Sequence, residues 1–313
     1  QWANQKRRMT MEEQHYHNPV LLAECIEGLA IQPNGTYVDV TFGGGGHSAV
    51  ILEQLGPEGR LFGFDQDADA AANRLQDERF KLLPYNFRFL KRFLRLEGVR
   101  QVDGILADLG VSSHQSDTAE RGFSFRFDAP LDMRMNRDGG QTAADVVQTY
   151  HERALQDLLS RYGEVRNART LAQRLVQARA QGSALHTVGE FIAAIEPCIK
   201  GKRNRYLSQV FQALRMEVNE EIEVLKDLLI QATDLLRPGG RLVVIAYHSL
   251  EDRLVKNWIK KGTFEREPDK DEYGNFYLPL KAMHKKVILP RPEEIQPNAR
   301  ASSAKLRIAA RAE

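Results

Sequence analysis

A short apolar segment that runs directly into four consecutive glycines constrains the fold of this chain more than any other feature. The segment is Tyr37 to Phe42, and the glycines are Gly43 to Gly46. Its β-branched and aromatic residues lie between turn-forming residues, which is typical of a buried strand. Glycines directly after a strand let the backbone turn sharply and approach a ligand, because no Cβ is in the way. The segment therefore predicts the first strand and the phosphate-binding or cofactor-binding turn of an α/β fold.

The residues that follow continue the alternation of strand and helix. Helix and strand patterns are found in turn at 49–55, 60–65, 68–75, 80–83 and 102–109. This βαβ order predicts a parallel sheet, in which ligands bind at the carboxyl ends of the strands. Asp65 and Asp108 stand at two such ends. Asp65 also lies about twenty residues past the glycines, the spacing expected of a carboxylate that accepts both hydroxyls of a ribose.

The next strand pattern, at 241–247, comes far later than one crossover helix requires, so an insertion is expected. Residues 112–140 show no clear period, but their aromatic residues and methionines argue against disorder. Helical patterns follow at 142–150, 152–162, 166–181 and 187–199. A long helical pattern over 208–236 then returns the chain to the sheet, and 285–289 with 305–309 predict a closing β pair.

We therefore expect an α/β protein with three parts. They are an N-terminal tail at 1–15, a core at 16–113 and 209–313, and a mainly helical substrate-recognition domain at 114–208. The opening residues, Gln1 to Arg8, are interpreted as an upstream extension and left out of the fold prediction.

Composition limits the class of protein and its partners. The formal net charge is only +2, so a polyanionic partner has to be met by local basic patches. Cys25 and Cys198 are far apart in sequence and predict free thiols of a reducing compartment. No apolar run reaches the roughly 18 residues of a membrane span, so a cytoplasmic location is expected. His15 and His17 alone are too few ligands to predict a metal site.

Two cofactor classes fit a glycine turn followed by an acid on the next strand. They are nicotinamide dinucleotides and S-adenosylmethionine. A G-x-G-x-x-G fingerprint that begins at Gly43 requires a third glycine at position 48, where Ser48 stands. A nicotinamide oxidoreductase remains the alternative, whereas the Pro-Gly-Gly turn at 238–240 and the final β pair favour a seven-stranded class I methyltransferase.

Longer motifs carry a specific resemblance. They are TFGGGGHS at 41–48, DLGVSSHQSD at 108–117, ERGFSF at 120–125, PLDMRM at 130–135, FQALRMEVNEE at 211–221 and YHSLEDR at 247–253. In this order, and over nearly the whole chain, they resemble the bacterial ribosomal RNA small subunit methyltransferase H family. One departure lies at 298–307, where Ala299 and Ser302 replace a proline and an arginine of the family pattern. An RNA contact by that segment is therefore not inferred.

The resemblance implies a class I, Rossmann-like methyltransferase sheet with an inserted α-helical domain, and S-adenosyl-L-methionine as cofactor. It further implies N4-methylation of a cytidine in the decoding region of 16S rRNA, with the assembled small subunit as the expected partner. The cofactor contacts that it implies are Gly45, Gly46, His47, Asp65, Phe87, Asp108 and Gln115. A factor that binds cofactor and RNA but has lost catalysis is the rival hypothesis.

Chemistry suggests further roles. The exocyclic amine of cytosine is a poor nucleophile, so an acceptor for its N–H assists transfer, and Asp108 serves either this purpose or the methyl donor. His248 is a second candidate for orienting the base, while Ser249 and Asp252 predict a capping box. Phe123 and Phe125 offer a stacking surface or a small satellite core. The candidate phosphate contacts, with a solvated basic turn as the alternative, are Arg134, Lys200, Lys202, Arg203 and Arg205.

Overall fold

The computed structural model describes residues 19–264, 273–274 and 278–313. The expected tail at 1–15 lies outside these residues, and so does His17. The chain divides into two compact units. The first comprises the residues up to Gly110 and those from Leu225 onward, and the second is Val111–Val224. The second unit extends past residue 208, where the inserted domain was expected to end, because a long helix packs within it.

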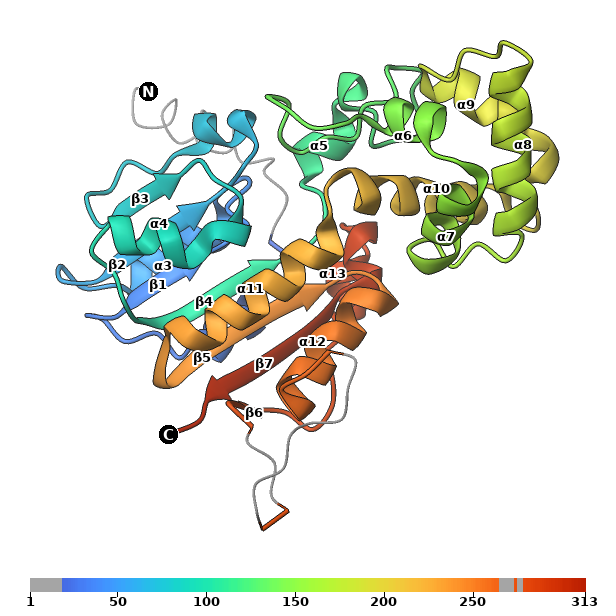
Figure 1. Cartoon of the computed structure of the whole chain (residues 1–313). Coiled ribbons are helices and arrows are strands. Elements are labelled where there is room, and N and C mark those ends of the chain that lie inside the picture. Colours follow the sequence, from blue (N-terminus) through green and yellow to red (C-terminus); the bar gives the residue numbers. More distant parts are fainter. Residues whose placement is uncertain (1–18, 265–272, 275–277) are drawn as a thin grey trace, which may run out of the picture. The chain divides into compact units, whose positions relative to one another are not determined.

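A seven-stranded sheet in the order β3-β2-β1-β4-β5-β7-β6 forms the first unit (Figure 1). Strands β1 to β5 are parallel, whereas β7 is antiparallel to both of its neighbours. The predicted α/β fold is confirmed. The strand bounds are β1 Thr36–Asp39, β2 Arg60–Phe64, β3 Phe80–Leu83, β4 Val102–Asp108, β5 Leu236–Ala246, β6 Leu280–Ala282 and β7 Lys305–Arg311.

Helices pack on this sheet, and alternate residues of its strands point to opposite faces. Val243 and Ile245 of β5 share one apolar cluster with Cys25 and Ile51, which come from the helices α2 and α3. On another side of the unit, Lys91 of α4 forms a 2.7 Å ion pair with Asp234 of α11. The helices of this unit are α2 Leu22–Leu29, α3 Gly46–Gln54, α4 Leu90–Leu96, α11 Glu221–Leu235 (which begins in the second unit), α12 Ser249–Lys261 and α13 Pro292–Ile295.

Short 3-10 helices complete the first unit, at η1 Ala68–Asn73, η2 Phe87–Phe89 and η5 Ala299–Ser303. The α-helix predicted at 68–75 is therefore a 3-10 helix. Across the described residues, no helix is both long and apolar enough to cross a bilayer.

The second unit is helical, as predicted, around an apolar core of its own. Its helices are α5 Ser113–Asp117, α6 Ala143–Thr149, α7 Glu152–Arg161, α8 Ala168–Ala180, α9 Val188–Ile195 and α10 Arg203–Val218, with 3-10 turns η3 Ala119–Arg121 and η4 Glu196–Cys198. The aperiodic region at 112–140 is ordered by its own hydrogen bonds. Arg121 is only 1% exposed, and its guanidinium donates to the carbonyls of Arg134 and Met135. Hydrogen bonds from a buried arginine side chain thus hold this segment, which has little regular secondary structure.

Two further sequence predictions of secondary structure are wrong. The single helix expected over 208–236 is broken, because Glu220 has φ 48° and Asn219 donates from its side-chain amide to the carbonyl of Met133. The helical spacing of apolar residues continues through the break, so the sequence pattern does not indicate where the helix is interrupted. In the closing β pair, the partner of β7 is β6 and not 285–289, from which only Ile288 forms an isolated bridge, to Leu306.

Candidate functional site

The glycine turn after β1 has a backbone conformation that glycine adopts more easily than any other residue. Gly43 and Gly45 have φ 50° and 76°, in the left-handed region. A Cβ on Gly45 would lie 3.0 Å from the ring of Phe42, and one on Gly46 would lie 2.5 Å from Cγ of Pro19. The turn therefore leads into α3 as bare backbone, which a nucleotide-like ligand can approach closely.

Asp65, directly after β2, is held by two backbone groups. Its Oδ2 accepts the N–H of Gly43 at 2.8 Å, and its Oδ1 accepts the N–H of Asp67 at 2.8 Å. Burial raises the pKa of the Asp65 carboxyl to about 6, although both N–H donors oppose this shift. Each carboxylate oxygen has two lone pairs, so each can accept one further hydrogen bond. The geometry fits a ligand with two adjacent hydroxyls, such as a ribose.

Asp108, the last residue of β4, is held on three sides. Its Oδ1 accepts the hydroxyl of Tyr247 at 2.7 Å, and its Oδ2 lies 4.0 Å from Nδ1 of His47. Its own N–H donates to Oγ1 of Thr41 at 2.7 Å. Burial raises the pKa of the Asp108 carboxyl, while His47 and the Tyr247 hydroxyl partly offset that shift. The result is a positioned carboxyl group that takes up a proton more readily than an exposed aspartate does.

His47 and Asp39 lie beneath this carboxyl group. His47 Nε2 is 3.1 Å from the carbonyl of Val20, and since a carbonyl only accepts, Nε2 carries the hydrogen and Nδ1 faces Asp108. Asp39 accepts the hydroxyl of Ser48 at 2.7 Å, and burial raises the pKa of the Asp39 carboxyl. Sequence reasoning missed both Asp39 and Tyr247. An aspartate within an apolar strand and a tyrosine at the end of β5 were the signals that could have found them.

Phe87 opens η2, after β3, and its side chain is partly buried. The preceding residue, Asn86, donates from its side-chain amide to Oε1 of Gln66 at 2.9 Å and so ties the ends of β2 and β3 together. In the order of the sheet, Phe87, Asp65, the glycine turn and Asp108 follow β3, β2, β1 and β4. The structure thus brings these predicted residues to the carboxyl edge of adjacent strands.

His248 is the N-cap residue of α12. Its Nδ1 accepts the N–H of Glu251 at 3.4 Å, and its Nε2 lies 3.1 Å from Oε1 of the same glutamate. The capping box predicted from Ser249 and Asp252 is wrong, because Asp252 forms a two-pronged ion pair with Arg307 at 2.7 and 3.0 Å. His248 is therefore first a structural residue of this helix start.

The remaining candidates belong to the second unit. Gln115 is buried and forms a capping box with Ser112, whose N–H donates to Oε1 of Gln115 at 3.0 Å. Phe123 and Phe125 are partly buried against the helical core, and the Phe125 ring meets Phe211 edge to face at 5.5 Å. Both aromatic side chains are thus partly covered by the core of the second unit.

The candidate phosphate contacts divide into two groups. Arg134 is paired with Asp132 through two hydrogen bonds at 2.8 and 2.9 Å, and Arg203 is paired with Glu196 at 3.0 Å. The exposed side chains without an ion pair to any described residue are Lys200, Lys202 and Arg205.

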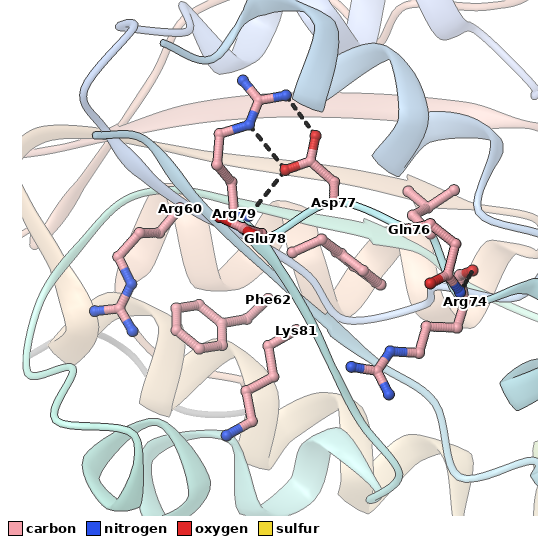
Figure 2. A pocket seen from close by; sticks show the side chains of 10 residues that line it. Arg60, Phe62, Arg74, Gln76, Asp77, Glu78, Arg79 and Lys81 are labelled. Carbon is pink, nitrogen blue, oxygen red and sulfur yellow. Dashed lines mark hydrogen bonds and ion pairs between the residues drawn. The ribbon is translucent and has the colours of Figure 1, made fainter. Parts of the chain in front are cut away.

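A hollow of about 630 Å³ lies elsewhere on the first unit (Figure 2). Its lining includes Arg60 and Phe80, the first residues of β2 and β3, so it opens at the amino edge of these strands. Figure 2 shows the guanidinium of Arg79 paired with the carboxylate of Asp77 across its rim. Because the glycine turn, Asp65 and Asp108 are at the opposite edge, this hollow is not part of the candidate site.

Comparison with known proteins shows the family to which the chain is similar. Residues 14–312 match the model of the MraW methylase family. A Christiangramia forsetii protein named ribosomal RNA small subunit methyltransferase H is 54% identical over 295 residues, which cover 94% of this chain and 97% of that protein. Proteins of the same name from Flavobacterium johnsoniae and Bacteroides thetaiotaomicron are 56% and 54% identical, covering 96% of this chain and 98% and 99% of theirs.

Proposed function

The chain belongs to the MraW methylase family, and from this membership we propose that it is a methyltransferase that uses S-adenosylmethionine to methylate the N4 amine of a cytidine in the decoding region of 16S rRNA. The observation that carries the proposal is the single edge of a class I sheet on which the glycine turn, Asp65 and Asp108 come together. We further propose that the substrate is the assembled small subunit in the cytoplasm, since the target lies in structured RNA.

The edge has the features that S-adenosylmethionine requires. The glycine turn would offer bare backbone to the amino-acid part and to the nucleoside, because no side chain projects from Gly43 to Gly46. Asp65 would accept the ribose hydroxyls, and Phe87 would pack on the adenine. When bound, S-adenosylmethionine supplies an electrophilic methyl group on a sulfonium.

Asp108 would act on the substrate amine. Its carboxylate would accept an N–H of the cytosine amine, align the nitrogen lone pair, and take the amine proton at Oδ2 once the methyl group has been transferred. Tyr247 would hold Oδ1 through its 2.7 Å hydrogen bond, so that Oδ2 keeps one direction. Burial raises the pKa of the Asp108 carboxyl, which makes this group a better proton acceptor than an exposed aspartate. His248, whose nitrogens both face Glu251, would act only by shaping the start of α12.

Methyl transfer tests the proposal directly. The protein is incubated with methyl-labelled S-adenosylmethionine and with small subunits from a strain that lacks this methylation. We expect label at N4 of one cytidine of 16S rRNA with the wild type. Label-free 16S rRNA together with intact cofactor binding would show a non-catalytic binding factor, and binding of NADH instead would show a nicotinamide enzyme.

The Asp108→Asn variant separates the two roles of this residue. We expect it to bind S-adenosylmethionine within about threefold of the wild type and to lose at least about 100-fold in the rate of transfer, the usual contribution of a general base. Equilibrium dialysis measures the first quantity and single-turnover labelling the second. If cofactor binding is lost as well, Asp108 serves the donor and its assignment to the amine is wrong.

A further inference from the structure

One surface of the first unit concentrates positive charge. The outer face of α12 and the segment after β6 line one hollow, and the exposed basic side chains on it are Lys256, Lys260, His284, Lys285 and Lys286. We call these five residues the α12 basic surface. None of the described residues that line the hollow is acidic.

The fold holds α12 in place beneath these side chains. Arg307 of β7 is paired with Asp252 of α12, which neutralises the one arginine that lines the hollow. Lys256 and Lys260 are four residues apart and therefore project from the same face of the helix. Ile259 is buried between α12 and the sheet. The two lysines thus stand on a fixed support.

The segment after β6 is fixed at both ends to β7. The N–H of Met283 donates to the carbonyl of Ile308 at 2.9 Å, and Ile288 and Leu306 exchange two hydrogen bonds, at 2.9 and 3.0 Å. Residues 284–287 consequently stand opposite Arg307 alone and have to bulge outward. This bulge carries Lys285 and Lys286 into solvent.

The charges on this surface are not compensated within the described structure. By contrast, Lys81 is paired with Glu97 and Lys91 with Asp234. No described residue forms an ion pair with Lys256, Lys260, Lys285 or Lys286. Like charges at this helical spacing repel each other, and a bound polyanion would relieve that repulsion. With a net charge of only +2 for the whole chain, such a concentration is not a consequence of bulk composition.

We propose that the α12 basic surface binds the phosphate backbone of RNA, at a place apart from the cytidine that is methylated. The inference rests on the proposed function, which supplies an RNA substrate. Lysines contact phosphates as point charges without reading sequence, which suits a surface that positions the substrate. Ile259 and Ile308, the large apolar side chains that line the hollow, are buried, so the hollow itself presents mainly charge.

The test removes three of these charges in the variant K256Q/K260Q/K285Q. A matched control, K81Q/K91Q/R95Q, removes three charges from β3 and α4. The affinity of each protein for protein-free 16S rRNA is measured across a series of KCl concentrations. Each phosphate contact contributes about 0.7 to the slope of log K against log salt, so the first variant should lower the slope by about 2 and bind about 100-fold more weakly at 0.1 M salt.

Two further measurements confine the effect to RNA binding. Cofactor affinity and the single-turnover rate at saturating subunit concentration should match the wild type, and the control variant should keep the wild-type slope. Equal slopes of log K against log salt for the two variants would refute the proposal that the α12 basic surface binds RNA. A loss of affinity for intact subunits but not for protein-free RNA would identify a ribosomal protein as the partner and also refute it. If the wild type itself neither binds nor methylates RNA, the proposed function fails instead.

Discussion

The affinity for S-adenosylmethionine should fall as pH decreases through about 6, because Asp65 then gains a proton. Burial raises the pKa of this carboxyl from 3.8 to about 6, and the ionised form is the one that accepts two hydroxyls. With a pKa of about 6, roughly nine tenths of the groups are ionised at pH 7 and roughly one tenth at pH 5. We therefore expect the affinity to decrease about tenfold between pH 7 and pH 5.

Isothermal titration calorimetry with S-adenosylmethionine at several pH values from 5 to 8 measures this dependence. The Asp65→Asn variant should bind more weakly at pH 7 and show no such step. Asp77→Asn is the matched control, since the Arg79 guanidinium lowers the pKa of Asp77 to about 2 and that carboxylate stays ionised throughout the range. A flat profile in the wild type would refute the reasoning, and so would a step that persists in Asp65→Asn.

Unfolding without ligand gives an independent check on the same carboxyl. Its folded-state pKa is raised, so the native state binds more protons than the unfolded state between about pH 4 and 6, and stability falls as pH rises through this window. Above pH 6 the full penalty is present, and below pH 4 it is absent. Urea denaturation should therefore show the stability of Asp65→Asn gaining on the wild type as pH rises from 4 to 6.

Two further changes act on the same edge of the sheet. Tyr247→Phe removes the hydroxyl that stabilises the ionised form of Asp108. The pH profile of the single-turnover rate should therefore shift to higher pH, and the rate at pH 7 should fall about tenfold. An unchanged profile would contradict a role for this hydrogen bond. Gly45→Ala adds a Cβ to a residue with φ 76° and places that atom 3.0 Å from the ring of Phe42. Urea denaturation should show that the free energy of unfolding falls by about 1 to 2 kcal/mol. A variant as stable as the wild type would contradict the expected strain.

The sequence allowed the sheet and its ligand edge to be predicted because parallel strands end together. Asp65 and Asp108 each stand at the end of a strand pattern, and the parallel order of the strands brings these ends to the same edge of the sheet. The contact of Tyr247 with Asp108 could not be predicted, because the two residues become neighbours only through the pairing of β4 with β5. That register is not visible in either segment alone.

Two of the predicted site residues also have partners close by in the sequence. The spacing of Ser112 and Gln115 is itself a capping-box signature, and the structure shows that box. Arg134 lies two residues from Asp132, which captures its guanidinium. A basic side chain near an acid in sequence is thus a weak candidate for phosphate contact until the pair has been examined.

The hydrogen bond from the N–H of Gly43 to Asp65 has a consequence for experiments that map the site by mutation. On the side of the glycine turn, the partner of Asp65 is backbone, and deleting side chains leaves backbone intact. In alanine scanning, a loss of ligand affinity would therefore be seen at Asp65, whereas the backbone N–H of the turn that binds Asp65 would not be tested. Substitutions that add atoms, or esters that replace single amides, are the tools that make this half of the site visible.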